Sequence, residues 1–359
     1  MIYLIVHRRS FIKLIGLILS IFNVRIFGYD TYNNDKISFK HGVASGDPTK
    51  NKIILWTKIS KTSKKTINVS WQVSDNKNFS YLINSGTIKS YSYNDFSVKV
   101  DAKIPDKYCG SEIYYRFYVN TIFSITGTTK TLPKNDPNNF NIAVCSCSNY
   151  PGGFFNAYKQ IANDKDIDLV LHLGDYLYEY DKDGYATEDS IRMNRVVEPK
   201  HEIVTLDDYR KRHALYKTDE DLQLLHSTKA MVAVWDDHEF TNDSWKYGAE
   251  NHSYDEGFFS TRKANAVKAY YEWMPIRESK SKLKIWRKFE IGSLFQLFML
   301  DTRSIYRDKQ LNLDSYINKD KFEVSRFKKD LLKKRDLVGK EQFKWLDKNI
   351  DSKFKWSII

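Results

Sequence analysis

Short stretches in which apolar and polar residues alternate fill the chain between Phe39 and Pro133, and turn residues separate them. Alternation with period two is typical of strands that bury one face and expose the other. The clearest stretches are 52–58, 66–73, 96–100 and 113–119. The pattern predicts a small antiparallel β-sandwich of immunoglobulin-like type over residues 37–133.

The pattern changes after the polar segment 134–139, which contains a proline and is typical of a linker. Apolar stretches typical of buried strands now alternate with stretches of helical periodicity, which predicts an α/β domain over residues 139–359. The predicted strands are 141–144, 167–173 and 230–235, and the predicted helices are 155–162 and 262–273. Ligands of such folds bind beyond the carboxyl ends of the strands.

The first 28 residues have the pattern of an export signal. A basic patch with Arg8 and Arg9 precedes an apolar run that is too short to span a bilayer comfortably, and Arg25 interrupts the far end of this run. The pair of arginines resembles the twin-arginine signal, whose machinery exports folded proteins. We therefore expect a periplasmic or extracellular protein; a transmembrane anchor is the alternative.

The composition is that of a globular protein, and 359 residues suit two domains. The net charge of +12 is compatible with an anionic partner, but the basic residues are spread along the chain and do not alternate with aromatic residues in any one run. We therefore predict no specific nucleic-acid site, and we expect a monomer. Three cysteines, Cys109, Cys145 and Cys147, are too few for a disulfide framework.

Candidate metal ligands follow the first two predicted strands of the α/β domain. Cys147 comes after the first, and a thiolate can bind a metal or act as a nucleophile, although a buried thiol is often only a small apolar residue. The second is followed by Gly174, Asp175 and Tyr178. A phenolate is a hard, anionic ligand suited to ferric iron.

The third strand is followed by an acidic cluster. Four acidic residues and one histidine occur within nine positions, and such a cluster is costly to hold together without a cation. They are Asp236, Asp237, His238, Glu239 and Asp243. The cluster favours a metal site; a solvated acidic loop is the alternative.

Together these motifs resemble the PhoD-type alkaline phosphatases and phosphodiesterases of the calcineurin-like metallophosphatase superfamily, in order and in spacing. The matching stretches are 39–48 (FKHGVASGDP), 55–57 (LWT), 147–150 (CSNY), 174–179 (GDYLYE), 209–210 (YR), 216–219 (YKTD), 235–239 (WDDHE), 271–277 (YEWMPIR) and 300–303 (LDTR). The resemblance implies an immunoglobulin-like domain followed by an αββα-sandwich metallophosphatase domain. It also implies hydrolysis of phosphate mono- or diesters at alkaline pH.

The resemblance implies a catalytic centre that contains Fe³⁺ and Ca²⁺. Cys147, Asp175 and Tyr178 correspond to iron ligands, with Asp175 bridging to calcium and Asn242 helping to hold calcium. Asp237 and His238 are analogous to a pair in related metallophosphatases that supplies a metal ligand and a histidine near the leaving group. His238 would protonate the leaving alkoxide or orient the phosphate, or alternatively fix the position of a carboxylate.

One element of the family pattern is not found in this sequence. Related enzymes supply further ligands from a later Gly-Asp-x-His element, which does not occur before Ile359. We therefore expect that the sequence is truncated at its C-terminus. Two alternatives to a PhoD-type hydrolase stay open: an enzyme similar to the purple acid phosphatases, and an inactive, truncated, secreted binding module.

Overall fold

The computed structural model describes residues 37–60, 62–279, 281, 283–318 and 320–359. The predicted export signal at 1–28 lies outside the described residues. None of the helices in the described ranges combines the length and the apolar character needed to cross a membrane. These helices are α2 (Asn156–Asn163), α3 (Leu206–Tyr216), α4 (Glu220–Thr228), α5 (Phe259–Trp273), α6 (Val324–Leu331) and α7 (Gly339–Asn349).

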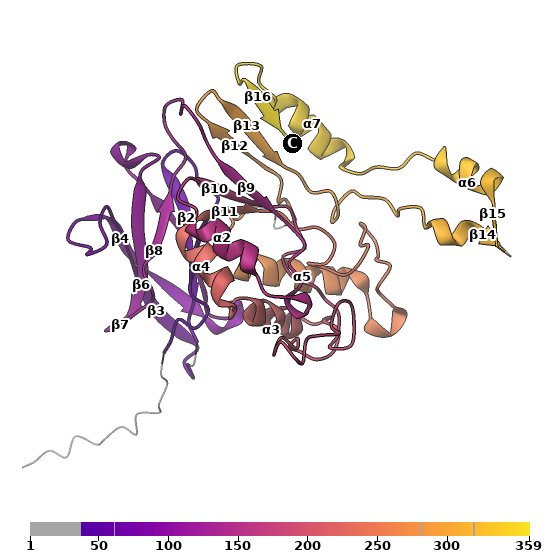
Figure 1. Cartoon of the computed structure of the whole chain (residues 1–359), viewed down its shortest axis with the longest axis horizontal. Coiled ribbons are helices and arrows are strands. Elements are labelled where there is room, and N and C mark those ends of the chain that lie inside the picture. Colours follow the sequence, from indigo (N-terminus) through magenta and orange to yellow (C-terminus); the bar gives the residue numbers. More distant parts are fainter. Residues whose placement is uncertain (1–36, 61, 280, 282, 319) are drawn as a thin grey trace, which may run out of the picture. The chain divides into compact units, whose positions relative to one another are not determined.

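A six-stranded mixed sheet lies at the centre of the fold (Figure 1). Its strands, in spatial order, are β5 (Ser97–Lys103), β2 (Lys52–Lys58), β1 (Val43–Gly46), β11 (Ala230–Ala233), β10 (Leu169–His172) and β9 (Ile142–Cys145). The pairs β9–β10, β10–β11 and β11–β1 are parallel, whereas β1–β2 and β2–β5 are antiparallel. The early strands β1, β2 and β5 therefore continue the sheet that contains the later, parallel strands.

The alternating sequence pattern did not predict this pairing. Ser45 pairs with Ala230 and Gly46 with Met231, across a separation of 185 residues in each case (230 − 45 and 231 − 46). A β-carbon on Gly46 would lie 2.5 Å from the carbonyl oxygen of Met231, so only glycine allows this close approach. The predicted immunoglobulin-like type and the predicted domain bounds stay predictions.

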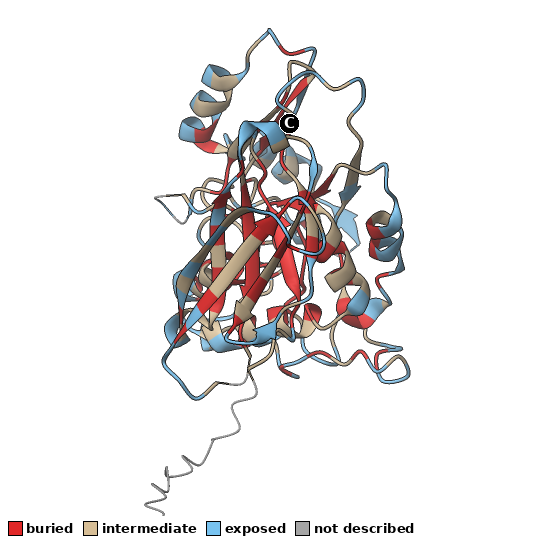
Figure 2. Ribbon diagram, turned by 90° about the vertical axis from the view of Figure 1, so that its left-hand side faces the viewer, coloured by how far each residue is buried: buried red, intermediate tan, exposed pale blue. Residues whose placement is uncertain are grey.

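A second, five-stranded sheet contains the other early strands. They are β4 (Leu82–Tyr91), β3 (Thr66–Ser74), β6 (Glu112–Val119), β7 (Ile122–Phe123) and β8 (Gly127–Lys130). In β6 every second side chain is buried, as its alternating sequence predicts. Buried residues of this sheet and of the six-stranded sheet belong to one hydrophobic core, and Figure 2 shows buried residues concentrated along the strands.

The remaining strands form two small sheets, and several short 3₁₀ helices connect the larger elements. The small sheets consist of β12 (Arg287–Ile291), β13 (Phe295–Met299) and β16 (Trp356–Ile358), and of β14 (Ile317–Asn318) and β15 (Lys321–Phe322). The 3₁₀ helices are η1 (Ser92–Asn94), η2 (Asp106–Tyr108), η3 (Tyr150–Gly152), η4 (Tyr254–Glu256) and η5 (Leu313–Tyr316).

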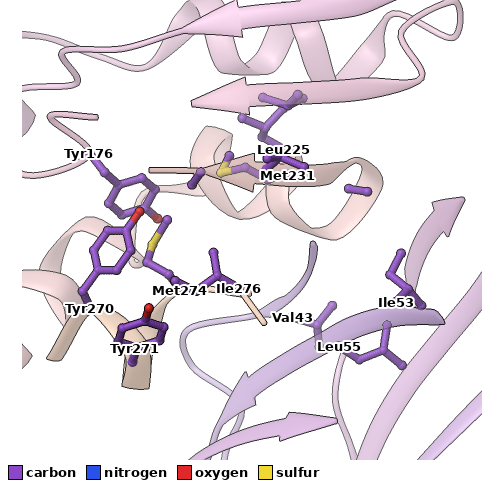
Figure 3. Close-up of a cluster of buried hydrophobic side chains, with 14 of the residues drawn as sticks. Val43, Ile53, Leu55, Tyr176, Leu225, Met231, Tyr270, Tyr271, Met274 and Ile276 are labelled. Carbon is purple, nitrogen blue, oxygen red and sulfur yellow. The ribbon is translucent and has the colours of Figure 1, made fainter. Parts of the chain in front are cut away.

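The predicted strands and helices of the α/β segment are confirmed as β9, β10, β11, α2 and α5. His172 of β10 pairs with Cys145 on one side and with Ala233 on the other, so the three parallel strands end at the same edge. Figure 3 shows that side chains of early strands, such as Val43, and of later elements, such as Met231, lie in one buried cluster. The loops that follow β9, β10 and β11 therefore leave the sheet side by side.

Candidate metal centre

The loops after β9 and β10 are joined by backbone hydrogen bonds. The amide of Cys147 donates to the carbonyl of Gly174 (3.2 Å), and the amide of Ser148 donates to the carbonyl of Asp175 (2.9 Å). Cys147 and Asp175 both have left-handed backbone conformations, with φ of 59° and 53°. Non-glycine residues adopt this region rarely, and such strain is concentrated at functional sites. As a result the Cys147 Sγ lies 3.4 Å from the Asp175 Oδ2.

Gly174 allows the loop after β10 to pass close to the loop after β11. Its φ is 112°, and a β-carbon at this position would lie only 2.4 Å from the amide nitrogen of Asp236. Any other residue would push the two loops apart. The glycine therefore fixes the distance between Asp175 and the acidic cluster.

Tyr178 belongs to the loop after β10, and its ring is buried against the donor group. The ring stacks on the imidazole of His238, with centroids 4.1 Å apart and an interplanar angle of 27°. Burial, the charge of Asp175 and the neighbouring thiol of Cys147 together raise the pKa of Tyr178 far above its ordinary value. A nearby cation of high charge is what would allow this phenol to ionise.

The loop after β11 brings two further donors to Asp175. Ligand atoms of Asp175, Asp237 and His238 lie within 4.8 Å of one another. Both carboxylates are buried. Burial raises the pKa of Asp175, and the charges of Asp237 and Asp236 act in the same direction against the opposing effect of His238. Buried carboxylates that face each other in this way are stabilised by a bound cation.

Glu179 fixes the orientation of His238. It is fully buried, and its Oε2 accepts a hydrogen bond from the His238 Nδ1 at 2.7 Å. Burial lowers the pKa of His238, but the hydrogen bond and the charge of Glu179, together with Asp175 and Asp237, outweigh this effect and raise the pKa to about 9. The other carboxylate oxygen of Glu179 accepts the backbone amide of Asn242 at 2.7 Å. Glu179 thus orders both the histidine and the end of the loop.

Glu239 has a different role from the other acids of its cluster. Its side chain points inward and accepts three backbone amides, from Tyr176 at 2.8 Å, from Asp175 at 3.0 Å and from Asp236 at 2.8 Å. Burial raises its pKa, and the charge of Asp175 adds to this rise. Glu239 therefore joins the loop after β10 to the loop after β11, and its carboxylate is turned away from the donor group.

Arg303 compensates a further part of the acidic charge. Its Nε donates to Asp236 at 2.6 Å, and its guanidinium nitrogens lie 3.5 Å from carboxylate oxygens of Asp237 and Asp243. Of the four acids in this stretch, only Asp237 belongs to the donor group of Asp175 and His238. The sequence pattern correctly indicated an unusual concentration of charge, but it did not distinguish the members that hold the backbone or an arginine.

Asn242 lies at the end of the same loop. Its side-chain amide nitrogen donates to the Oε2 of Glu250 at 2.9 Å, and the residue lines a cavity together with Asp243. Asn242 therefore lies between Glu179, which accepts its backbone amide, and the cavity. Its predicted role as a calcium ligand stays a prediction.

The donor chemistry fits the predicted ions. A thiol, a phenol, an imidazole and two buried carboxylates converge on one edge of the sheet. Sulfur and phenolate donors suit iron, and carboxylate oxygens suit calcium. Cys109, Cys145 and Cys147 are all free thiols. His172 and His41 are buried, and His172 is hydrogen-bonded to the hydroxyl of Tyr158 at 2.9 Å.

Sequence reasoning assigned no role to Glu179 or Arg303, and it counted Glu239 only as a member of the acidic cluster. Glu179 and Glu239 were visible only as members of short motifs, and nothing in their spacing showed that their carboxylates are buried against backbone amides. Arg303 is 60 positions or more away from the acids that it contacts. Only the folded chain brings these charges together.

The fold and the donors define an α/β protein with a candidate metal centre at the carboxyl ends of its parallel strands. Residues 142–359 match the family model described as PhoD-like phosphatase, and residues 28–133 match the model for the N-terminal domain of PhoD-like phosphatases. This chain belongs to the PhoD-like phosphatase family.

Two relatives are similar over most of the chain. Alkaline phosphatase D of Bacillus subtilis (strain 168) is 36% identical over 344 residues, which are 91% of this chain and 56% of the relative. A solved structure of PhoD is 35% identical, with a TM-score of 0.76, over 89% of this chain and 61% of that chain. The chain thus spans less than two thirds of the length of either relative. The matches favour this family over the purple acid phosphatases.

Proposed function

We propose that this protein is a metal-dependent hydrolase of phosphate mono- and diesters, of the alkaline phosphatase D type. The observation that supports it most is the convergence of Asp175, Asp237 and His238 within 4.8 Å, beside Cys147, in a chain of the PhoD-like phosphatase family. The finer fold assignment, an immunoglobulin-like domain followed by an αββα sandwich, is part of the same proposal.

Cys147, Asp175 and Tyr178 would hold Fe³⁺, and Asp175, Asp237 and Asn242 would hold Ca²⁺. When bound, such cations neutralise phosphate oxygens and lower the pKa of water, which supplies a nucleophile near neutral pH. The buried carboxylates of this chain are suited to this task because they bring negative charge into a region of low dielectric constant, where a cation is bound more strongly.

His238 would act on the oxygen of the leaving alcohol. Its Nδ1 is bound to Glu179, so its Nε2 is the nitrogen left for a proton transfer or for a hydrogen bond to the phosphate. The stacked ring of Tyr178 restricts the rotation of the imidazole. Glu179 would thus hold the histidine in one orientation, as carboxylates do beside catalytic histidines.

The test is hydrolysis of p-nitrophenyl phosphate and of its bis-ester by the protein supplied with Fe³⁺ and Ca²⁺. We expect Asp175→Asn and Asp237→Asn to lower kcat by roughly a thousandfold or more, because each removes a charge that holds the cations. Asp255→Asn, on an exposed residue, is the matched control. Full activity after exhaustive chelation would contradict the proposal. A folded, metal-loaded protein that hydrolyses neither ester would instead support the binding-module alternative.

Export is proposed on the resemblance of the N-terminal segment to a twin-arginine signal. Replacing Arg8 and Arg9 with lysine should leave an unexported precursor inside the cell, because the pathway recognises the arginine pair. The measurement is the distribution of the protein between cell and exterior fractions. Unimpaired export of the double variant would refute this route.

A further inference from the structure

A cavity of about 730 Å³ opens beside the candidate metal centre. One wall contains Asn242 and Asp243, which belong to the same loop as Asp237 and His238. The backbone amide of Asp243 donates directly to the Asp237 Oδ2 at 2.6 Å. A residue that lines the cavity is therefore in direct contact with a proposed metal ligand. Its volume lies within the range of sites that hold small organic molecules.

A second part of the lining consists of residues 309–316, and side-chain contacts hold this wall in place. The Gln310 side chain donates to the carbonyl of Asp243 at 3.4 Å. Asn312 accepts the amide of Asp314 at 2.9 Å and so caps η5. Tyr316 is buried, and its hydroxyl donates to Asp330 at 2.9 Å. The wall is thus tied both to the loop after β11 and to α6.

The lining combines apolar and hydrogen-bonding groups. Trp245 lies beside Gly248, where a β-carbon would come within 2.7 Å of the indole, and the Lys309 Nζ lies 4.8 Å from the ring centroid. Ala249, Leu311 and Leu313 add apolar surface. The polar uncharged lining residues are Asn242, Gln310, Asn312 and Ser315.

The charges of the lining are mainly negative. Asp243, Glu250 and Asp314 contribute carboxylates, whereas Lys309 is the lysine of this lining. A second anionic group on a ligand would therefore meet a net negative wall. An uncharged group with hydroxyls and an apolar face would find partners of both kinds.

We propose that this cavity receives the alcohol part of the phosphate ester and selects an uncharged arm of about nucleoside size. This inference rests on the proposed hydrolase function. The phosphate would lie at the donor group of Asp175, Asp237 and His238, and the alcohol would extend past Asn242 between Trp245 and the wall at 309–316. The cavity would thereby determine which esters bind, while the metal ligands determine the reaction.

The experiment compares ethyl phosphate, whose alcohol is too small to reach the cavity, with adenosine 5′-phosphate. Leu313→Trp and Ser315→Trp fill the cavity from exposed positions, so both variants should fold. We expect each to raise KM for adenosine 5′-phosphate by at least about tenfold. For ethyl phosphate, kcat/KM should stay within about twofold of the parent value. Leu332→Trp, at an exposed leucine outside the cavity, is the matched control.

Equal changes for both esters, or no change for adenosine 5′-phosphate, would overturn the assignment of the cavity while leaving the hydrolase proposal intact. A second phosphate on the ribose should weaken binding in the parent, and tighter binding would also contradict the inference. If the parent hydrolyses neither of these monoesters, nor p-nitrophenyl phosphate or its bis-ester, the hydrolase proposal fails. The cavity is then judged by calorimetric titration with adenosine: binding that Leu313→Trp removes supports the site, and the absence of binding refutes it.

Discussion

The loop after β10 lies between two clusters of buried charged groups, one acidic and one basic. On the front, Asp175 faces Asp237 and His238 in the donor group. On the back, the next residue, Tyr176, contacts a fully buried lysine: the Lys217 Nζ lies 3.0 Å from the Tyr176 hydroxyl and 3.0 Å from the His226 Nε2. Adjacent residues of one loop therefore separate an acidic cluster from a basic one.

The two clusters offset the desolvation cost of buried charge in different ways. Burial lowers the pKa of Lys217 to about 7 and the pKa of His226 well below its ordinary value, so the basic side approaches neutrality and is satisfied by hydrogen bonds within the protein. The acidic side keeps its carboxylates close together, where a cation can compensate them. A nearly neutral network suits a structural role, and a cluster that keeps its charges suits a ligand site.

Substitution of Glu239, which accepts the backbone amides of both Asp175 and Tyr176, should lower stability the most. Glu239→Gln keeps the shape of the side chain but presents an NH₂ group to backbone amides that now donate to a carboxylate oxygen. We expect the free energy of unfolding to fall by about 2–4 kcal/mol, because buried amides lose their acceptor. Urea unfolding measures it, with Glu188→Gln, at an exposed position, as the control. A loss no larger than in the control would show that Glu239 does not hold the loops together.

Removal of bound cations should lower the stability of the protein through the donor group of Asp175, Asp237 and His238 alone. At a metal concentration about a hundredfold above the dissociation constant, binding contributes about 2.7 kcal/mol to the free energy of unfolding. We expect a chelator to lower Tm of the metal-loaded parent, and to have little effect on Asp175→Asn, whose site is already impaired. A Tm that does not respond to chelation in the parent would argue against a metal centre.

Lys217, in the basic cluster, should make the free energy of unfolding depend on pH. The pKa of Lys217 is about 7 in the folded protein, against an ordinary value of 10.5 that applies to the unfolded chain. Below pH 7 both states bind the proton and the full cost of burial is present. Between these values only the unfolded state binds it, so this lysine makes stability rise with pH by about 1.4 kcal/mol per pH unit. Above pH 10.5 the cost is absent.

Lys217→Met should remove that slope. Chemical unfolding of the parent and the variant at several pH values between about 7 and 10 gives the difference, from which shared contributions of other groups cancel. We expect the variant to gain most relative to the parent near the lower end of this range. A constant difference over this range would mean that Lys217 does not change its protonation on unfolding.

Tyr178→Phe should have the smallest effect on stability and a distinct effect on colour. It keeps the ring stacked on His238 and deletes only the hydroxyl, so we expect the free energy of unfolding to change by less than about 1 kcal/mol. A phenolate bound to ferric iron absorbs visible light, whereas a phenolate bound to calcium does not. The iron-loaded variant should therefore lose the absorption band that the parent shows. An unchanged spectrum would mean that Tyr178 is a packing residue and no ligand.

Cys147→Ser gives an independent comparison. Replacing a thiolate with a hydroxyl puts a harder and weaker donor at the same position, so the visible band should shift or weaken while the phenol stays in place. If both variants leave the spectrum unchanged, the iron assignment fails for the loops after β9 and β10 alike.

By itself, the sequence determined the local elements and the places where chemistry gathers. Alternation predicted strands such as β6, helical periodicity predicted α5, and the acidic and aromatic motifs after three apolar stretches predicted a site where parallel strands end. These features follow from neighbours in the chain, since strand and helix periodicity are local properties. The convergence of Cys147 and Asp175 also follows once their strands are adjacent.

The tertiary structure decided the rest. It paired β1 with β11, turned Glu239 inward to backbone amides, placed Arg303 among the acids and buried Lys217 behind the loop after β10. The sequence shows the charge of each residue, but whether that charge becomes a ligand, a brace or a neutral core group depends on burial and on partners far away in the chain. Burial and long-range pairing are properties of the folded chain, because desolvation and hydrogen bonding act between groups that only folding brings together.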